Sequence, residues 1–180
     1  MNQPFLTDIK IIRERARKHL EKGALTEGYK ADREKIIALL NEALATEIVC
    51  ILRYKNHHFL ASGIHSDAVA NEFLQHANEE QVHADNISRR IVQLQGKPNW
   101  SPEGLKTRSH AEYVAGESLV QMIKENLVAE RIAIDTYREM IVYIGDNDPT
   151  TRRLLEGILE QEEEHADDLA NLLSDFEAKP

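Results

Sequence analysis

Apolar residues recur at helical spacings of three and four along four stretches of this chain, and each series is interrupted near its middle by a glutamate. The stretches are 32–61, 66–95, 117–144 and 148–177, and the interrupting residues are Glu47, Glu80, Glu130 and Glu162. A helix with one apolar stripe must bury that stripe against its neighbours. Helices of this length run roughly 40–45 Å. The sequence therefore predicts an all-α protein in which four long helices pack as a bundle.

Capping residues place the ends of these helices. Suitable N-caps are Asp32, Ser66 and Asp148, the last followed by a proline at the first helical position, and suitable C-caps are Gly96 and Gly145. The short outer connections predict two antiparallel hairpins, and the middle connection, about residues 96–116, is long enough to cross the whole bundle. A shorter helix is expected near 6–22. We expect an N-terminal helical extension, residues 1–31, and a bundle domain, residues 32–180.

A Glu-x-x-His-Ala-Asp motif occurs twice in the chain. One copy begins with Glu80 and His83, and the other with Glu162 and His165. Residues three apart on a helix share a face, so each motif directs its glutamate and its histidine at one point in the bundle. A single Glu-x-x-His on a helix is common and has little meaning alone. Two copies at the middle of two apolar stripes indicate a shared site.

The remaining two glutamates repeat at matching intervals. Glu47 precedes Glu80 by 33 residues, and Glu130 precedes Glu162 by 32. A tyrosine follows each of them seven residues later, at Tyr54 and Tyr137. The chain thus contains a two-helix unit used twice, and each unit supplies one Glu, one Glu-x-x-His and one Tyr.

Four glutamates at the centre of an apolar bundle need a compensating charge. An unpaired ionised carboxylate in a dry core costs several kcal/mol even after relaxation, and four of them would repel one another. Two divalent metal ions remove this cost. Carboxylates with imidazoles suit iron or manganese, and carboxylates can bridge two ions. The pattern predicts a dimetal carboxylate site; surface positions for the individual glutamates are the alternative.

Composition narrows the class of protein. The chain has 180 residues, with 22 Lys and Arg against 31 Asp and Glu, and a net charge of −9. This balance argues against a dedicated nucleic-acid binder and suits a protein that attracts cations. Cys50 is the single cysteine, so no disulfide forms within the chain. The charged start is not a secretory signal, and no run of 18 apolar residues exists, so we expect a cytoplasmic protein without membrane contact.

At these residues the chain resembles the ferritin-like superfamily, specifically the bacterioferritins and the Dps-like ferritins. The resemblance covers about residues 32–177. It implies two iron ions per chain, with manganese as the alternative metal: one held by Glu47 and His83, the other by Glu130 and His165, and both bridged by Glu80 and Glu162. The implied activity is that of a ferroxidase, which oxidises Fe(II) with dioxygen or hydrogen peroxide and deposits Fe(III) inside a hollow homo-oligomer.

Three departures from the family pattern refine this expectation. Bacterioferritins carry a haem-binding methionine directly after the first glutamate of Glu-x-x-His, where this chain has Gln81, so we expect no haem. Only fifteen residues follow His165, too few for the fifth helix of 24-subunit ferritins, which favours a dodecamer. Thioferritins carry a cysteine pair near the site, and this chain has Cys50 alone.

Several neighbours of the site have more than one interpretation. Tyr54 and Tyr137 either hydrogen-bond the ligating carboxylates, or supply an electron, or are ordinary buried tyrosines. Glu79 and Gln161 either orient the histidine of the opposite motif or face solvent. His76 is a core histidine in preference to an extra ligand or an iron-entry residue. We expect Cys50 to be a small core residue and Trp100 to anchor the crossover against the bundle or a neighbour.

Other functions are consistent with parts of the sequence. The segment from Asp8 to Lys22 has six Lys or Arg and three Asp or Glu, so it could bind DNA phosphates, although its own apolar stripe favours packing on the bundle or at a subunit interface. A dimetal peroxidase or oxidase of the rubrerythrin kind, without mineral storage, is the second candidate function. A helical binding or structural protein without metal is the third.

Overall fold

The computed structural model describes residues 7–63 and 66–177, and every regular element in these ranges is a helix. In chain order the elements are α1 (Ile9–Arg15), the 3₁₀ turn η1 (Leu20–Lys22), α2 (Arg33–Leu60), α3 (Ser66–Gln93), α4 (Leu105–Arg108), α5 (Leu119–Ile144) and α6 (Pro149–Glu177). The four long helices lie within three residues of the predicted stretches. The prediction of an all-α bundle is confirmed.

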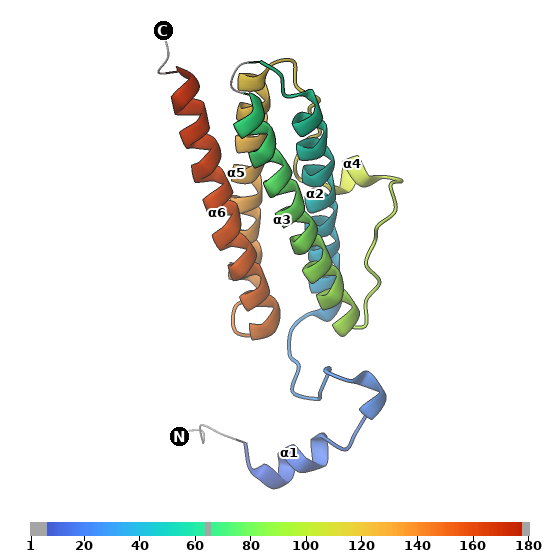
Figure 1. The fold of residues 1–180 in the computed structure, drawn as a ribbon. Coiled ribbons are helices and arrows are strands. Elements are labelled where there is room, and N and C mark those ends of the chain that lie inside the picture. The colour runs from blue at the N-terminus through green and yellow to red at the C-terminus, as the bar shows by residue number, and fades with distance from the viewer. Residues whose placement is uncertain (1–6, 64–65, 178–180) are drawn as a thin grey trace.

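The four long helices form two antiparallel hairpins, α2 with α3 and α5 with α6 (Figure 1). The connection between α3 and α5 runs alongside α2 from one end of the bundle to the other and includes the short helix α4 (Figure 1). This crossover brings the second hairpin against the first in the opposite orientation, so that α5 begins at the end of the bundle where α2 ends (Figure 1). Equivalent positions of the two hairpins therefore meet at the middle of the bundle.

Two predicted helix starts are capped as expected, and one is not. The carboxylate of Asp32 accepts a hydrogen bond from the Lys35 amide at 3.1 Å. Asp148 accepts one from the Thr151 amide at 3.0 Å, which satisfies a free donor of the first turn. Ser66 is instead the first residue of α3, and its hydroxyl donates to the Gly63 carbonyl at 2.8 Å.

Both predicted C-terminal glycines lie at helix ends, for different reasons. Gly145 ends α5 at φ +51°, a backbone angle that favours glycine. At the end of α3 the positive φ belongs to Gln95, at +60°, and the amides of Gln95 and Gly96 bond back to Val92 and Ile91. A Cβ on Gly96 would lie 2.9 Å from the side chains of Ile37 and Ile91. Glycine is therefore needed at position 96 because a side chain there would clash, and Gln95 supplies the left-handed backbone angle of the turn.

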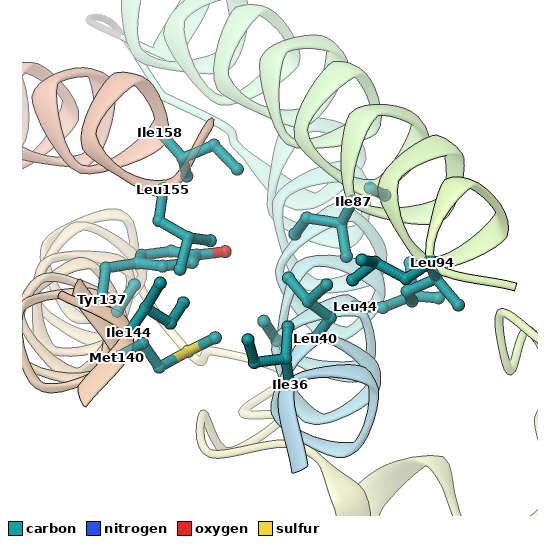
Figure 2. Packing of buried hydrophobic residues seen from close by; sticks show 14 of the residues in the cluster. Ile36, Leu40, Leu44, Ile87, Leu94, Tyr137, Met140, Ile144, Leu155 and Ile158 are labelled. Carbon is teal, nitrogen blue, oxygen red and sulfur yellow. The ribbon is translucent and has the colours of Figure 1, made fainter. Parts of the chain in front are cut away.

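The core consists of two apolar clusters separated by a polar layer. One cluster lies at the end of the bundle where α2 begins, and Figure 2 shows side chains of α2 and α3 meeting those of α5 and α6. Its labelled members are Ile36, Leu40, Leu44, Ile87, Leu94, Tyr137, Met140, Ile144, Leu155 and Ile158. The other cluster includes Cys50, Tyr54, Phe73, Ile123 and Leu169. Apolar packing on both sides holds the polar layer in place and excludes water from it.

A buried ion pair ties the two hairpins together at one end. The Arg90 guanidinium contacts both carboxylate oxygens of Asp148, at 2.8 and 2.9 Å, and donates to the Thr151 hydroxyl at 2.8 Å. The Tyr29 hydroxyl also donates to Asp148, at 2.9 Å. The segment before α2 is thereby fixed to the start of α6. In the crossover between α3 and α5, Trp100 donates to Ser88 of α3 at 3.0 Å, so its predicted anchoring of the crossover to the bundle is confirmed.

The N-terminal segment differs from its prediction. The expected single helix near 6–22 is the shorter α1 followed by η1, and residue 6 lies outside the described residues. Its apolar stripe does not pack on the bundle of the same chain, because Ile9, Ile12 and Leu20 are 56%, 44% and 75% exposed. Figure 1 shows α1 set apart from the four long helices. Packing of this stripe across a subunit interface stays a prediction.

Within the described ranges, no helix combines the length and the apolar character that a membrane span requires.

Candidate metal centre

Four glutamates and two histidines meet in the polar layer at the middle of the bundle. α2 and α5 each contribute one glutamate, and α3 and α6 each contribute a glutamate and a histidine one turn apart. The exposed fractions are 1% for Glu47, 1% for Glu80, 2% for His83, 0% for Glu130, 1% for Glu162 and 2% for His165. The central interruption of each apolar stripe thus marks one shared, water-excluded cluster, as the sequence pattern predicts.

The cluster divides into two overlapping sets of ligand atoms. One set is Glu47, Glu80, His83 and Glu162, and the other is Glu80, Glu130, Glu162 and His165; within each set one atom per residue lies within 4.8 Å of the others. His83 Nδ1 lies 3.4, 3.2 and 3.1 Å from oxygens of Glu47, Glu80 and Glu162. Ligand atoms of one ion with bonds of about 2.1 Å are separated by about 3.0–3.4 Å. Both sets include Glu80 and Glu162, so these two carboxylates lie between the two groups of ligand atoms.

The outer nitrogens of the two histidines are held by residues of the opposite hairpin. His83 Nε2 lies 2.9 Å from Gln161 Oε1, and His165 Nε2 lies 2.8 Å from Glu79 Oε2. Both partners are acceptors, so each Nε2 carries the proton and donates it. In the neutral rings the Nδ1 lone pairs then face the carboxylates, as metal ligands require. The interpretation of Glu79 and Gln161 as contacts of the opposite histidine is confirmed.

Each of the two buried tyrosines hydrogen-bonds a glutamate of the other hairpin. The Tyr54 hydroxyl of α2 donates a short hydrogen bond to Glu130 Oε1 on α5, and the Tyr137 hydroxyl of α5 donates one to Glu47 Oε1 on α2. Each tyrosine occupies one oxygen of its glutamate. The other oxygen, Oε2 in both residues, is left facing the cluster. The expected contact between these tyrosines and the central carboxylates is therefore present.

Burial and mutual repulsion divide the four carboxyl groups into two kinds. Burial and the nearby charge of Glu80 raise the pKa of Glu47 to about 8. Burial and the charges of Glu162 and Glu80 raise the pKa of Glu130 well above its ordinary value. For Glu80 and Glu162 burial also opposes ionisation, but the close approach of Glu47 to Glu80 and of both histidines to both carboxylates outweighs it and lowers their pKa values. Burial and repulsion thus favour the neutral form of Glu47 and Glu130, and close contacts favour the ionised form of Glu80 and Glu162.

The pKa values of both histidines are raised, which favours their charged form. Burial opposes their charge, yet the close approach of Glu162 and other carboxylates raises the pKa of His83 and raises that of His165 to about 11. Without metal, two imidazolium ions then balance two carboxylates at neutral pH. This balance still leaves buried polar atoms without a hydrogen-bond partner: Glu47 Oε2, Glu80 Oε1, Glu130 Oε2, both oxygens of Glu162, and His165 Nδ1.

Those unpartnered atoms fit a pair of metal ions. Each one lies within 4.0 Å of a ligand atom of another residue in the cluster, and each is a carboxylate oxygen or an imidazole nitrogen. Leaving such an atom buried without a partner costs about 1–3 kcal/mol, and more when it is charged. Six of them converging on one layer are accounted for by cations, and oxygen with nitrogen donors suits iron or manganese.

His76 is buried on the α3 stripe, as expected, and also joins the cluster. Its ring stacks on that of His165 with the centroids 4.0 Å apart, and its Nδ1 lies 3.2 Å from the Tyr54 hydroxyl. Burial and the charge of His165 lower its pKa to about 3, so the ring is neutral. Cys50 is a buried core thiol as predicted, and burial raises its pKa.

Arg53 was not identified from the sequence, although it is 1% exposed and lies beside the site. Its guanidinium donates to Asn126 Oδ1 at 2.8 Å and to the Glu112 carbonyl at 2.9 Å. The Asn126 amide in turn lies 3.0 Å from His57 Nδ1. Arg53 thus places a permanent positive charge behind the carboxylate layer. The polar residue Asn126 on the apolar α5 stripe was the available signal.

Comparison with known proteins agrees with this geometry. Residues 37–178 match the ferritin-like domain of the ferritin family. A bacterioferritin of Desulfovibrio desulfuricans is 30% identical over 140 residues, 77% of this chain and 74% of the relative.

Solved structures lead to the same family. A dodecameric thioferritin, the bacterioferritin-related protein of Bacteroides fragilis, is 32% identical with a TM-score of 0.79, over 82% of this chain and 89% of that one. The structure of the D. desulfuricans bacterioferritin, described with a diiron site, is 27% identical with a TM-score of 0.72, over 81% of each chain. This chain belongs to the ferritin-like domain family.

Proposed function

We propose that this protein is a ferroxidase that stores and detoxifies iron. One observation carries the proposal: two ligand sets, each with one histidine and one glutamate of its own, share the buried carboxylates Glu80 and Glu162. Such a centre holds two Fe(II) ions side by side, as substrates. Two ions can supply the two electrons that reduce dioxygen to hydrogen peroxide, or hydrogen peroxide to water.

The assignment of ligands follows the two sets. Glu47 and His83 hold one ion, Glu130 and His165 hold the other, and Glu80 and Glu162 bridge both. We propose iron as the metal, two ions per chain, with manganese as the alternative that the same oxygen and nitrogen donors would accept. Four carboxylates balance the charge of two divalent ions, and their negative charge offsets the further charge that develops when each ion loses an electron.

The surrounding residues position these ligands. Gln161 and Glu79 keep the proton on the outer nitrogen of His83 and His165, so that Nδ1 stays available as a ligand. Tyr54 and Tyr137 hold one oxygen of Glu130 and Glu47, which leaves the second oxygen for metal. The apolar clusters on either side keep bulk water from the layer.

We propose further that the chain assembles into a hollow homo-oligomer of twelve subunits, in which Fe(III) is deposited. The dodecameric relative from B. fragilis supports this number. A net charge of −9 favours the local accumulation of cations. We propose no haem, because the position after Glu80 is Gln81, whose side chain donates to Asp85 at 3.0 Å and provides no thioether ligand.

The proposal is tested by mixing the metal-free protein with two Fe(II) per chain under nitrogen and then admitting oxygen. Formation of Fe(III) is followed by absorbance in the wild type, in Glu162→Gln and in Glu164→Gln. Glu162 is buried in both ligand sets, whereas Glu164 is exposed two residues along the same helix. The two variants remove the same charge from the same helix.

We expect Glu162→Gln to slow oxidation more than the roughly 10–100-fold that loss of an outer partner of a ligand costs. Glu164→Gln is expected to match the wild type. Melting temperatures of the three proteins separate a lost ligand from a lost fold. Equal oxidation rates in Glu162→Gln and the wild type would rule out the proposed centre.

A further inference from the structure

A third cluster of metal-ligating groups lies at the seam between α3 and α6, next to the dinuclear cluster. It consists of Glu72 and His76 of α3 and Asp168 of α6, which offer one ligand atom each within 4.8 Å of one another. His76 Nε2 lies 3.3 Å from Glu72 Oε1 and 3.8 Å from Asp168 Oδ2. The histidine side chain is 0% exposed, while the carboxylates are 28% and 44% exposed. The cluster therefore has a buried end and a solvent end.

Hydrogen bonding determines which nitrogen of His76 faces the carboxylates with a lone pair. Tyr54 has a single hydroxyl proton, which it donates to Glu130. The Tyr54 oxygen can then only accept from His76 Nδ1, 3.2 Å away, so Nδ1 carries the ring proton. The lone pair of the neutral ring is on Nε2, a buried atom with no hydrogen-bond partner. It points at two groups that are themselves acceptors.

We propose that Glu72, His76 and Asp168 form a third metal site, which binds one divalent cation of the Fe(II) or Mn(II) kind. Bonds of about 2.1 Å separate ligand atoms by about 3.0–3.4 Å, so the 3.3 Å contact fits as it stands and the 3.8 Å contact needs only a small movement of the part-exposed Asp168. One imidazole with two carboxylates suits these metals. Burial and the nearby carboxylate of Asp168 also raise the pKa of Glu72, as expected where acidic groups face each other.

The third site binds more weakly than the dinuclear centre. It has three protein ligands and two part-exposed carboxylates, whereas each ligand set of the dinuclear centre has four buried residues. An ion in it keeps water ligands on its exposed side. We expect metal to load the dinuclear centre first and the third site afterwards.

Equilibrium binding of Mn(II) tests the site directly. The full-length protein is dialysed anaerobically against increasing Mn(II), and the metal per chain is measured for the wild type, Asp168→Asn and Asp167→Asn. Asp167 is exposed and adjacent on α6, so the two variants remove the same charge from the same helix. Glu72→Gln is a second variant, at a part-exposed residue on the other helix of the cluster.

We expect three Mn(II) per chain in the wild type and in Asp167→Asn, and two in Asp168→Asn and Glu72→Gln. Electron paramagnetic resonance adds a second readout, because an isolated Mn(II) gives a six-line signal that the coupled pair does not. Loss of that signal in Asp168→Asn supports the site. A wild type that saturates at two, or an Asp168→Asn variant that keeps three, overturns it.

The position of the site also suggests what it does for the dinuclear centre, an inference that depends on the proposed ferroxidase function. His76 stacks on His165, and His76, Glu79 and His165 form a further group of ligand atoms within 4.8 Å. Ligating atoms thus continue from the exposed carboxylates to the buried pair. We expect the third site to deliver Fe(II) inward.

Delivery is tested by the initial oxidation rate at limiting Fe(II). Asp168→Asn is expected to slow the initial rate several-fold while oxidising the same final amount, and Asp167→Asn to behave as the wild type. If Asp168→Asn loses the third Mn(II) but keeps the wild-type initial rate, the proposed delivery of Fe(II) is overturned and the proposed third metal site still stands. No oxidation by the wild type contradicts the ferroxidase proposal and leaves the Mn(II) stoichiometry as an independent result.

Discussion

Binding of two divalent metal ions to the dinuclear centre is expected to release about four protons per chain at pH 7. Without metal, Glu47 and Glu130 are protonated, because their pKa values are raised to about 8 and well above the ordinary value. His83 and His165 are also protonated, because their pKa values are raised. All four groups must lose a proton to act as ligands, whereas Glu80 and Glu162 are already ionised.

Charge balance supports this count. The metal-free layer has two imidazolium ions and two carboxylates, so its net charge is about zero; the loaded layer has four carboxylates and two divalent ions, which again gives about zero. A buried layer that stays neutral in both states avoids a large cost of burying net charge.

The dependence on pH has a definite sign. Glu47 is protonated below a pKa of about 8, so at pH 9 its proton is already lost and fewer protons are released. His165, with a pKa of about 11, still contributes at pH 9. Metal binding is therefore expected to strengthen as pH rises. The overall constant for both ions should increase by about four powers of ten per pH unit near pH 7.

Anaerobic calorimetry with Mn(II) in buffers of different ionisation enthalpy measures the protons released. In the wild type we expect about four protons at pH 7 and a smaller number at pH 9, where Glu47 has already lost its proton. Glu164→Gln, at an exposed residue outside both ligand sets, is the control and should give the same numbers. A release of one proton or none at pH 7 would mean that the layer is ionised before metal binds, and the electrostatic reasoning would be wrong.

Three further perturbations follow from individual contacts. Gln161→Leu removes the acceptor of His83 Nε2, so we expect the Mn(II) affinity, measured by titration, to fall roughly 10–100-fold. The circular dichroism spectrum should not change. An unchanged affinity would contradict the orienting role of Gln161. Tyr137→Phe removes the hydrogen bond to buried Glu47 and should cost about 1–3 kcal/mol of unfolding free energy in urea, whereas Tyr143→Phe, at a half-exposed residue, should be neutral. Asp148→Ala breaks the buried ion pair with Arg90 and should lower the free energy of unfolding by about 3–5 kcal/mol. Asp146→Ala, at an exposed residue, should lower it by less than about 0.5 kcal/mol. Similar losses in the two variants would refute the structural importance of the Arg90–Asp148 pair.

The sequence allowed the bundle and the composition of its centre to be predicted because both depend on helical periodicity. Glu47 and Glu130 stand out only because apolar residues surround them at spacings of three and four. Burial of a charge is expensive, so a glutamate in that position must have a partner. The structure brings the six predicted residues together. Their assignment as ligands remains a proposal.

Features that depend on how the two hairpins meet could not be read from the sequence. Tyr54 contacts Glu130 and Tyr137 contacts Glu47, across the bundle, whereas periodicity relates each tyrosine only to its own helix. The third cluster was missed for the same reason. Glu72 and Asp168 are off the apolar stripes, so periodicity does not single them out, whereas the packing of α3 against α6 places both beside His76.

Local conformation was the other source of error. A glycine near a helix end usually supplies the positive φ, but in α3 Gln95 adopts that angle, and crowding by Ile37 requires glycine at position 96. The N-terminal stripe has the spacing of a buried helix face, yet Ile9 and Leu20 are exposed in the single chain. Periodicity shows that a surface is apolar, and it does not show which surface covers it.

The most direct test of iron oxidation with storage is the amount of iron that the protein keeps. Fe(II) is added aerobically in large excess, the mixture is separated by gel filtration, and iron per chain and particle mass are measured on the same peak. We expect tens of iron atoms or more per chain, in a particle with the mass of about twelve chains. Retention of about two would support the dinuclear centre without storage, and a peak with no iron would contradict the proposed function.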